Sequence, residues 1–417
     1  MSIPYYDIII VGSGMGGLYS AYNIKNISPH SSFLVLEKHK KQWIGGRTSN
    51  ENFYGVEVVT GAGIGRKDTN PLLIQLLKRL NIPYSEFTSK MNYAKTFHPV
   101  NIMNIINKLK IEYKKHPELE RDTFKDFFIK ILGEKLYKEF IISAGYTDYE
   151  YADIKETLYN YGMDDNMGGW IGLHIPWKKL VEKLYHVIGK NHFKFSSEVV
   201  SIKKIKEEPC LFEIQIDNGL KYFCNKVILA TTINGIQKLV PGASEKNSIY
   251  QQIHGQPFLR LYAKFDKKSA EIMKKMVPTY TIVPGPLQKI LPMNAEKGVY
   301  MISYSDNSNA LILKKYLENT SKNRELFCNL IEKSLGLPKD SLNIISIKDF
   351  YWPIGTHYYE PLPTNFKNRD DFVYKVQHPE KGMLIVGEVV SRYQGWVEGA
   401  LESVKTVLSK QWIQTKC

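Results

Sequence analysis

Residues 6–11 (YDIIIV) form an apolar, mostly β-branched run that leads directly into a glycine-rich turn, GSGMGG, at residues 12–17. Such a run is typical of a central parallel strand that is buried on both faces. A helix-like segment begins at Leu18, and a second strand, residues 32–36, is followed by Glu37. A glycine-rich turn alone indicates only a turn. Strand, turn, helix, strand and acid in this order are the fingerprint of a dinucleotide-binding α/β unit.

Each glycine of the turn has its own expected task. Gly12 permits the tight turn, Gly14 lets the backbone approach a pyrophosphate, and Gly17 lets the helix and strand pack closely. Gly16 completes the turn, and the amides at the start of the helix offer hydrogen bonds to phosphate oxygens. Glu37 is expected to accept hydrogen bonds from a ribose diol, which disfavours a 2′-phosphate and therefore NADP.

The charge balance argues against a nucleic-acid-binding protein. The 417 residues include 56 Lys+Arg and 42 Asp+Glu, a net charge of +14, but only eight of the basic residues are Arg. A phosphate-binding surface favours the bidentate fork of arginine, so we expect a small-molecule substrate and no specific nucleic acid. The sequence has no apolar run long enough to span a membrane and no leader before the first strand, which favours a soluble, cytoplasmic protein. The sequence is compatible with a homodimer.

The cysteines give no sign of a metal centre. Cys210, Cys224, Cys328 and Cys417 include no CxxC pair, so zinc-site and thioredoxin-like spacings are absent. A chain of this length does not need a disulfide framework. We therefore expect no metal site and four unpaired thiols in a reducing compartment.

Further glycine-containing segments follow the first turn. They are GGRT at 45–48, TGAGIGR at 60–66 and MLIVGE at 383–388, the last leading into SRYQGWVEGALES at 391–403. Together and in this order they resemble the flavin-dependent amine oxidase family, which includes monoamine oxidases, polyamine oxidases and L-amino-acid oxidases. The resemblance reaches both ends of the chain. It implies that FAD oxidises a primary or secondary amine to an imine, which is hydrolysed to an aldehyde or keto acid while O2 is reduced to H2O2.

The resemblance also implies an α/β fold with a Rossmann-like FAD-binding domain and a discontinuous substrate domain, which combines a mixed sheet with a helical cap. We expect residues 1–90, 190–250 and 375–417 to form the FAD-binding domain. The substrate domain then takes residues 91–189 and 251–374, with the helical cap near 98–186.

The cofactor contacts follow from the same resemblance. The backbone at Gly45 and Gly46 is expected to lie against the flavin, and Arg47 to donate to the pyrophosphate. Glu388 is expected near the ribityl chain or the pyrophosphate. The amides of the last helix are expected to stabilise negative charge on the reduced flavin. The other cofactor contacts that the resemblance implies are Gly63, Ile64, Val199, Gly387, Trp396 and Val397.

Three positions are expected at the reacting face. Members of the family enclose the amine between two aromatic side chains, and Tyr358 and Trp396 take those positions here. Arg260 falls where many relatives carry a lysine that holds a water beside the flavin. Arginine can hold a water but does not deprotonate, so a dehydrogenase with another electron acceptor stays open. His357 falls where covalently flavinylated relatives carry a cysteine, which favours non-covalent FAD and leaves His357 as a polar pocket residue.

The sequence leaves the substrate open. Tyrosines and carboxylates gather at residues 145–153 and 161–165, with Asp165 as a candidate ligand. They line a tunnel for a cationic amine or are solvated loop acids. Arg66 loosely resembles the arginine that grips the substrate carboxylate in L-amino-acid oxidases, but a helix cap or an ion pair would explain it equally. An amino acid such as lysine would use both features. The scaffold also resembles carotenoid desaturases and protoporphyrinogen oxidases, which act on apolar substrates, and a flavin-binding protein without turnover is a further alternative.

Overall fold

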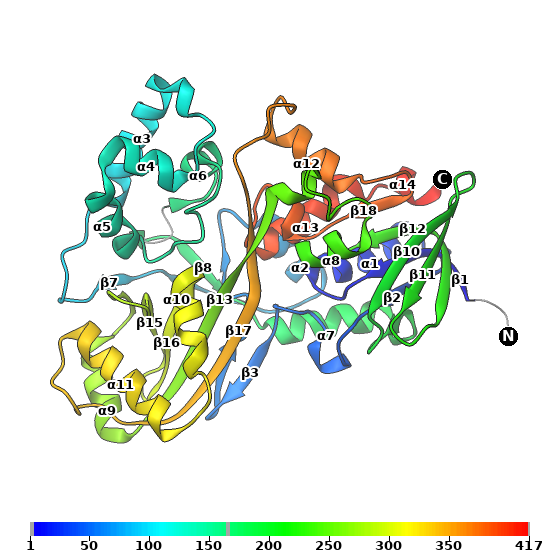
Figure 1. Cartoon of the computed structure of the whole chain (residues 1–417). Coiled ribbons are helices and arrows are strands. Elements are labelled where there is room, and N and C mark those ends of the chain that lie inside the picture. The colour runs from blue at the N-terminus through cyan, green and yellow to red at the C-terminus, as the bar shows by residue number, and fades with distance from the viewer. Residues whose placement is uncertain (1–3, 164–166, 416–417) are drawn as a thin grey trace.

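The computed structural model describes residues 4–163 and 167–415, in which two large sheets and a separate group of helices stand out (Figure 1). The first sheet has the order β10-β11-β12-β1-β2-β9, and β18 pairs with the carboxyl-terminal half of β12. Its strands are β1 (Tyr5–Val11), β2 (Phe33–Leu36), β9 (Phe193–Lys194), β10 (Val199–Lys206), β11 (Leu211–Ile216), β12 (Lys221–Leu229) and β18 (Met383–Ile385). The helices around it are α1 (Met15–Ile27), α2 (Pro71–Arg79), α7 (Trp177–Ile188), α8 (Ile233–Leu239), α12 (Arg369–Gln377), α13 (Val397–Val407) and α14 (Lys410–Gln414).

The side chains of β1 join this sheet to a core on each face. Ile8 and Ile10 pack with α1, α7 and α13, whereas Ile9 and Val11 pack with α8 and α12 on the opposite face. The strand is parallel to both neighbours, β2 and β12. Because both faces are covered, the strand needs apolar residues at four successive positions, which confirms the central buried strand that the sequence predicted.

The second sheet has the order β17-β13-β16-β15-β14-β7. Its strands are β7 (Met91–Tyr93), β13 (Ile253–Phe265), β14 (Tyr280–Ile282), β15 (Lys289–Asn294), β16 (Val299–Asp306) and β17 (Ile344–Tyr359). One face packs against the helices α9 (Lys267–Met276), α10 (Asn307–Leu313) and α11 (Ser321–Leu335). The opposite face contacts a hairpin of β3 (Asn50–Phe53) and β4 (Val56–Val59). The long strands β13 and β17 pair along their whole length and run through the middle of the molecule (Figure 1).

A group of helices near the start of β7 forms the cap, drawn in cyan at the upper left of Figure 1. It consists of α3 (Ile102–Lys115), α4 (Phe124–Leu132), α5 (Glu134–Ala144) and α6 (Ile154–Tyr159). The cap has its own core, in which rings such as Phe124, Phe128 and Phe140 are fully buried against one another. Asn101, Thr123 and Asp153 cap three of these helices through their side chains, as their residue types favour.

The short elements connect these parts. A small sheet joins β5 (Gly65–Arg66), β8 (Ile171–His174) and β6 (Ser85–Thr88) in the order β5-β8-β6. Short 3-10 helices lie at Lys41–Trp43, Pro117–Leu119, Lys190–His192, Ile249–Gln252, Lys314–Tyr316 and Glu388–Val390.

Helix α7 packs on the first sheet, whereas its residues were expected in the substrate domain. Trp177, Leu180 and Leu184 are fully buried in the core that contains α1 and β1. The expected substrate-domain segment, residues 91–189, therefore includes a helix that packs on the first sheet, and the cap of the structure ends with α6. The apolar stripe of α7 matches the face of α1, which no local pattern in the sequence reveals.

The expectation of four unpaired thiols is wrong, because one of them, Cys210, forms a disulfide. Cys224 and Cys328 are free and buried, but Cys210 is disulfide-bonded.

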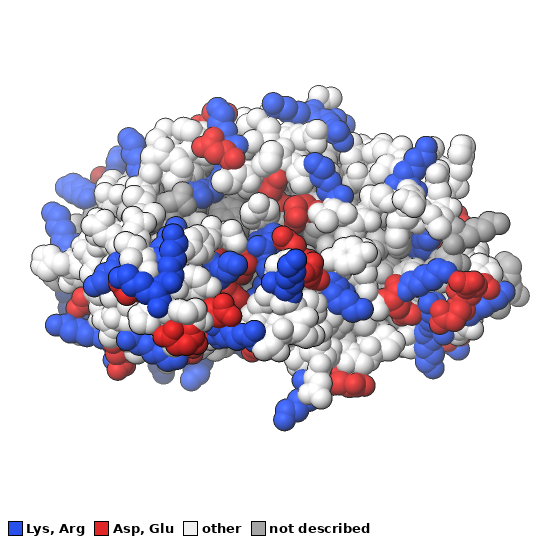
Figure 2. All heavy atoms as spheres, turned by 90° about the horizontal axis from the view of Figure 1, so that it is seen from above, with Lys and Arg blue, Asp and Glu red and all other residues white. Residues whose placement is uncertain are grey.

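The positive charge is spread out. Figure 2 shows Lys and Arg side chains over the upper face with Asp and Glu side chains between them, and no broad area of one sign. Of the helices in the described ranges, none has the length and apolar character needed to cross a membrane.

Candidate active site

In the glycine-rich turn between β1 and α1, two glycines are closely surrounded by backbone atoms and a third is not. Gly12 has φ +101°, and a Cβ on it would lie 2.4 Å from the carbonyl oxygen of Ala230. A Cβ on Gly17 would lie 2.0 Å from the carbonyl oxygen of Gly12. Gly14 is different, because its φ of −68° suits any residue and a Cβ there would meet nothing within 4 Å. The backbone at Gly14 therefore faces open space rather than protein.

Two other predicted segments contact this turn. The amide of Gly45 donates to the carbonyl oxygen of Ser13 over 2.9 Å, and Gly45 forms a bridge with Gly14. A Cβ on Gly46 would lie 3.8 Å from the Cα of Gly14. A Cβ on Gly16 would lie 3.2 Å from Gly387, which follows β18. The structure thus brings together glycines that are up to 375 positions apart in the chain.

Glu37 follows β2, and hydrogen bonds from Ser13 in the glycine-rich turn hold its side chain in place. Its Oε2 accepts hydrogen bonds of 2.8 Å from the amide and from the hydroxyl of Ser13, and its Oε1 accepts one of 2.9 Å from the amide of His39. The amide of Ser197 donates to the carbonyl oxygen of Glu37, so the segment leading to Val199 passes this end of the strand. A carboxylate has about four lone-pair positions, which leaves Glu37 able to accept one further hydrogen bond.

Glu388 stands at the centre of a buried cluster. Its Oε1 accepts from Arg47 Nη1 at 2.9 Å and from His357 Nδ1 at 2.6 Å, while its Oε2 accepts from the amide of Gly395 at 3.0 Å. Arg47 Nη1 also donates to the carbonyl oxygen of Gly355 at 2.6 Å. Burial alone would raise the pKa of Glu388, but His357 and Arg47 hold it well below its usual range. The carboxylate thereby ties Arg47 to the segment that leads into α13.

His357 has a protein hydrogen-bond partner at each ring nitrogen. Its side chain is completely buried, and its Nε2 accepts a hydrogen bond of 3.2 Å from the amide of Ile233. Because Nε2 is an acceptor, the hydrogen is on Nδ1, which donates it to Glu388. Both ring nitrogens are thus occupied by protein atoms. His357 therefore links Glu388 to α8, and it also lines the cavity described below.

Arg260, on β13, lies beside the predicted flavin-side loop. Its Nε donates to the carbonyl oxygen of Gly61 over 2.7 Å, and a Cβ on Gly63 would lie 3.0 Å from its Nη2. The guanidinium also lies over the ring of Tyr304, 4.1 Å from the ring centroid. The neighbouring residue Ile64 is only partly buried. The side chain of Arg260 is therefore a fixed cation against this loop.

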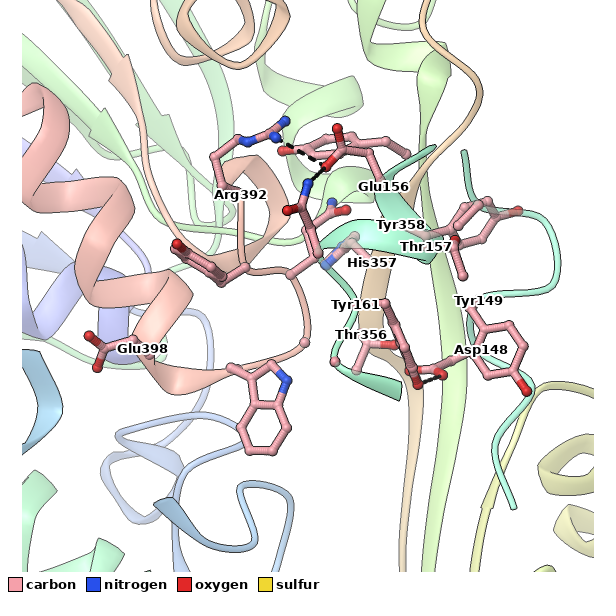
Figure 3. A pocket seen from close by; sticks show the side chains of 18 of the residues that line it. Asp148, Tyr149, Glu156, Thr157, Tyr161, Thr356, His357, Tyr358, Arg392 and Glu398 are labelled. Carbon is pink, nitrogen blue, oxygen red and sulfur yellow. Dashed lines mark hydrogen bonds and ion pairs between the residues drawn. The ribbon is translucent and has the colours of Figure 1, made fainter. Parts of the chain in front are cut away.

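A cavity of about 180 Å³ lies where the cap, the end of β17 and the segment before α13 meet (Figure 3). Tyr358 and Trp396, the two aromatic residues predicted at the reacting face, both line it. Burial raises the pKa of Tyr358 to about 12. The ring of Tyr358 stacks on His254 with 5.2 Å between the ring centroids, and His254 Nε2 lies 2.7 Å from Glu360.

The cap supplies acids and tyrosines to the same cavity. Asp148, Tyr149, Glu156 and Tyr161 line it, and the hydroxyl of Tyr161 donates to the carboxylate of Asp148 (Figure 3). Burial and then the nearby carboxylate of Asp306 raise the pKa of Asp148 to about 7, although Tyr161 and Lys289 act in the opposite direction. Of the predicted cluster at 145–153 and 161–165, the residues Asp148, Tyr149 and Tyr161 line this cavity. Asp165 lies outside the described residues.

Arg66 also lines the cavity, from β5. Its guanidinium lies over the ring of Trp170, 4.6 Å from the centroid, and its amide donates to Asn70 Oδ1 over 2.8 Å. The side chain is buried. The cavity thus contains a cation as well as carboxylates.

The comparison with protein families matches residues 15–407 to the family described as flavin containing amine oxidoreductase. The chain belongs to this family. The match spans nearly the whole chain and confirms the resemblance drawn from the glycine-containing segments.

Two further comparisons extend this result. A curated relative, uncharacterized protein R188 of Acanthamoeba polyphaga mimivirus, is 21% identical over 505 residues, which cover 97% of this chain and 94% of the relative. Among solved structures, a single-substitution mutant of putrescine oxidase is similar with a TM-score of 0.73 at 14% identity, covering 97% of this chain and 98% of that chain. Wild-type putrescine oxidase bound to putrescine is similar with a TM-score of 0.71 at 14% identity, covering 96% and 98%. These structures confirm the predicted amine-oxidase-like α/β fold.

Membership of this family of flavin amine oxidoreductases implies a flavin, and the residues of the first sheet fit one. Gly14 leaves open space at the turn, and α1 begins with no side chain capping its first amides. Uncapped amides and open space at a helix amino terminus are what a pyrophosphate requires. In this flavoenzyme the turn, Glu37, Arg47 and the start of α13, including Val397, would hold the group. Among residues 4–163 and 167–415, His, Cys, Asp and Glu side chains form no cluster that could bind a metal ion.

The sequence-based prediction did not include several residues that line the cavity. Glu156, Arg392 and Gln394 line the cavity, and so does Glu398, although both of its carboxylate oxygens accept from amides at the start of α2. Arg392 stands in the same motif as Trp396 and was open to prediction from that neighbourhood. Glu156 carried no signal, because only the packing of the cap places it here.

Proposed function

We propose that this flavin amine oxidoreductase binds FAD non-covalently and oxidises a cationic amine, either a polyamine or an amino acid such as lysine. The imine product is hydrolysed to an aldehyde or keto acid, and O2 is reduced to H2O2. The observation that carries the proposal is one cavity in which Trp396 and Tyr358 meet the carboxylates Asp148 and Glu156. An apolar substrate would not favour such walls, because it would remove water from these carboxylates without supplying a cation or a hydrogen-bond donor in return.

FAD rather than a mononucleotide flavin is supported by the turn at Gly12–Gly17 together with Glu37, since this unit is built for a dinucleotide. Non-covalent binding is supported by His357, whose two ring nitrogens are both engaged with the protein. The free cysteines of the described chain, Cys224 and Cys328, are buried in the cores of the two sheets, away from this cavity.

Bound FAD supplies the acceptor for a hydride equivalent, and the protein supplies orientation and electrostatics. Trp396 and Tyr358 exclude water and orient the reacting C–H bond. Asp148 accepts hydrogen bonds from the substrate amine next to the reacting C–H bond. For an amino acid, the Arg66 guanidinium would hold the carboxylate as a charge-assisted pair. Arg260 holds a water or the loop carrying Gly61 in place.

Replacing Trp396 by alanine is expected to slow anaerobic reduction of the flavin about tenfold while the flavin content of the purified protein stays the same. The reason is that the indole orients the substrate, whereas the flavin is held mainly by backbone. Stopped-flow absorbance measures the limiting rate of reduction. Equal rates in the mutant and the wild type would refute the assignment of Trp396 to the reacting face.

Binding of a diamine is expected to weaken as the pH falls through 7. Asp148, with its pKa near 7, is ionised above that pH and attracts an ammonium group, whereas below it the carboxyl takes up a proton. The bound ammonium favours the ionised form, so the half-saturating diamine concentration rises by up to about tenfold per pH unit below 7. The measurement is this concentration between pH 6 and 8. Asp148→Asn should raise it and flatten its pH dependence, and an unchanged slope in that variant would exclude Asp148 as the amine ligand.

The direct test of the function is the visible spectrum of the purified protein, followed anaerobically as putrescine, longer polyamines and then L-lysine are added. Bleaching by polyamines alone favours the acidic wall as the decisive feature. Preferential bleaching by L-lysine favours Arg66 as a carboxylate ligand, a second candidate that its place in the cavity supports. A flavin that none of these donors bleaches would overturn the proposed amine oxidation.

A further inference from the structure

An ion pair joins the cap to the segment that carries Trp396. Arg392 Nη2 lies 3.1 Å from Glu156 Oε2, and the dashed line in Figure 3 marks this contact at one side of the cavity. Glu156 belongs to α6, and Arg392 lies four residues before Trp396. Both side chains line the cavity. The pair therefore closes one side of the cavity by charge rather than by apolar packing.

Arg392 has a second carboxylate partner outside the cavity. Its Nε lies 3.1 Å from Asp370 Oδ1, near the start of α12, and the side chain of Asp370 is 80% exposed. The third nitrogen, Nη1, is buried without a hydrogen-bond partner among the residues that the structure describes. If Arg392 lost Glu156, the pair with Asp370 would still hold its charge.

Glu156 lies toward the solvent end of the cavity. The exposed residues Asn160 and Tyr393 line the cavity as well, and Asn160 Nδ2 donates to Glu156 Oε2 over 2.8 Å. The side chains of Glu156 and Arg392 are 19% and 25% exposed. An ion pair open to solvent contributes only about 1 kcal/mol or less. Exchanging the arginine for another cation at Glu156 therefore requires little free energy.

We propose that Glu156 and Arg392 form a charge-exchange latch at the entrance of the cavity. A remote ammonium group of the substrate takes the carboxylate of Glu156, and Arg392 remains paired with Asp370. The latch rests on the proposed oxidation of cationic amines and adds to it a selection for substrates with a second positive charge. A monoamine, which has no second ammonium group, leaves the Glu156–Arg392 pair intact.

The latch predicts that two charge-neutralising variants raise the half-saturating concentration of a diamine and that a third lowers it. Glu156→Gln removes the ligand and should raise the half-saturating concentration of a diamine about fivefold, the equivalent of one exposed ion pair. Arg392→Gln removes the competitor and should lower that concentration about threefold. Asp370→Asn removes the outer partner, so Arg392 is held more firmly at Glu156 and the concentration should rise about twofold.

The experiment measures anaerobic flavin reduction against the concentration of a linear diamine and of a monoamine of the same chain length. The monoamine should show less than about a twofold change in every variant. In the Glu156→Gln background, Arg392→Gln should have no further effect on diamine binding, because the two residues act on one event. The shift in melting temperature on adding the diamine reports binding without turnover and should be largest in Arg392→Gln.

A rise in the diamine concentration for Arg392→Gln, additive effects in the double variant, or equal effects on monoamine and diamine would each overturn the latch. Unchanged flavin content and melting temperature without amine show that a variant is folded. If wild-type flavin is reduced by amines but the variants do not follow these signs, only the latch fails. If no amine reduces the wild-type flavin or raises its melting temperature, the proposed function fails and the latch with it.

Discussion

Replacing Gly14 by valine is expected to leave a folded protein that no longer holds its flavin. A Cβ at Gly14 would meet no protein atom within 4 Å, and the φ of −68° is accessible to valine, so we expect the fold to tolerate the change. The same side chain would occupy the space through which a pyrophosphate approaches the amides of α1. Losing two charge-assisted hydrogen bonds would weaken flavin binding roughly 100-fold or more. Flavin absorbance of the purified protein and titration of the apoprotein with FAD measure this loss.

Gly17→Ala is the matched comparison within the same turn. A Cβ at Gly17 would lie 2.0 Å from the carbonyl oxygen of Gly12, so this smaller change strains the turn itself and should lower the melting temperature. Gly14→Val should not lower the melting temperature of the apoprotein. Retention of a full flavin complement by Gly14→Val would show that the dinucleotide does not lie over this turn.

Replacing Arg369 by methionine is expected to lower the melting temperature by roughly 3 to 6 °C, because removing one member of a buried ion pair costs about 3–5 kcal/mol. Arg369 Nη2 donates to Asp153 Oδ2 at 2.8 Å and to the carbonyl oxygen of Glu360 at 2.7 Å. The two side chains are 3% and 6% exposed. Their partnership joins the start of α6 in the cap to the start of α12. Differential scanning calorimetry measures the effect.

The control is the double variant Arg369→Met with Asp153→Asn. If the cost of the single change comes from leaving the Asp153 carboxylate buried without its cation, the double variant should recover part of the lost stability. Asp153 also caps α6, since its side chain accepts from the amide of Glu156, and asparagine retains that cap. A single variant as stable as the wild type would show that the pair contributes nothing to joining the cap.

Local pattern was enough to predict the first sheet and its turn. Residues 8–11 need apolar side chains on both faces, and Gly12 and Gly17 need to be glycine because of atoms a few positions away or in the neighbouring strand. Such requirements appear in the sequence itself. The packing of α7 does not, because an amphipathic helix reads the same whether it covers a cap or a sheet.

The candidate site also contains residues that a sequence motif predicts and residues that only tertiary packing brings there. Trp396 and Tyr358 were open to prediction because each stands inside a motif. His357 shows the limit of that reasoning, because it lines the cavity beside Tyr358 while its ring nitrogens are hydrogen-bonded to Glu388 and to the amide of Ile233 in α8. Glu156 had no motif, and Arg392 gains its meaning only from two carboxylates that are distant in the sequence.

The separate aromatic core of the cap has a consequence for how such an enzyme can diverge. Tyr358 and Trp396 are anchored by β17 and by the segment before α13, whereas Asp148, Glu156 and Tyr161 belong to a unit that folds around its own phenylalanines. Substitutions or insertions in that unit can lengthen, shorten or recharge the cavity while the geometry around the flavin remains as it is. Selectivity and redox chemistry in this chain can therefore evolve as two independent modules, and an engineer seeking a new substrate would begin in the cap.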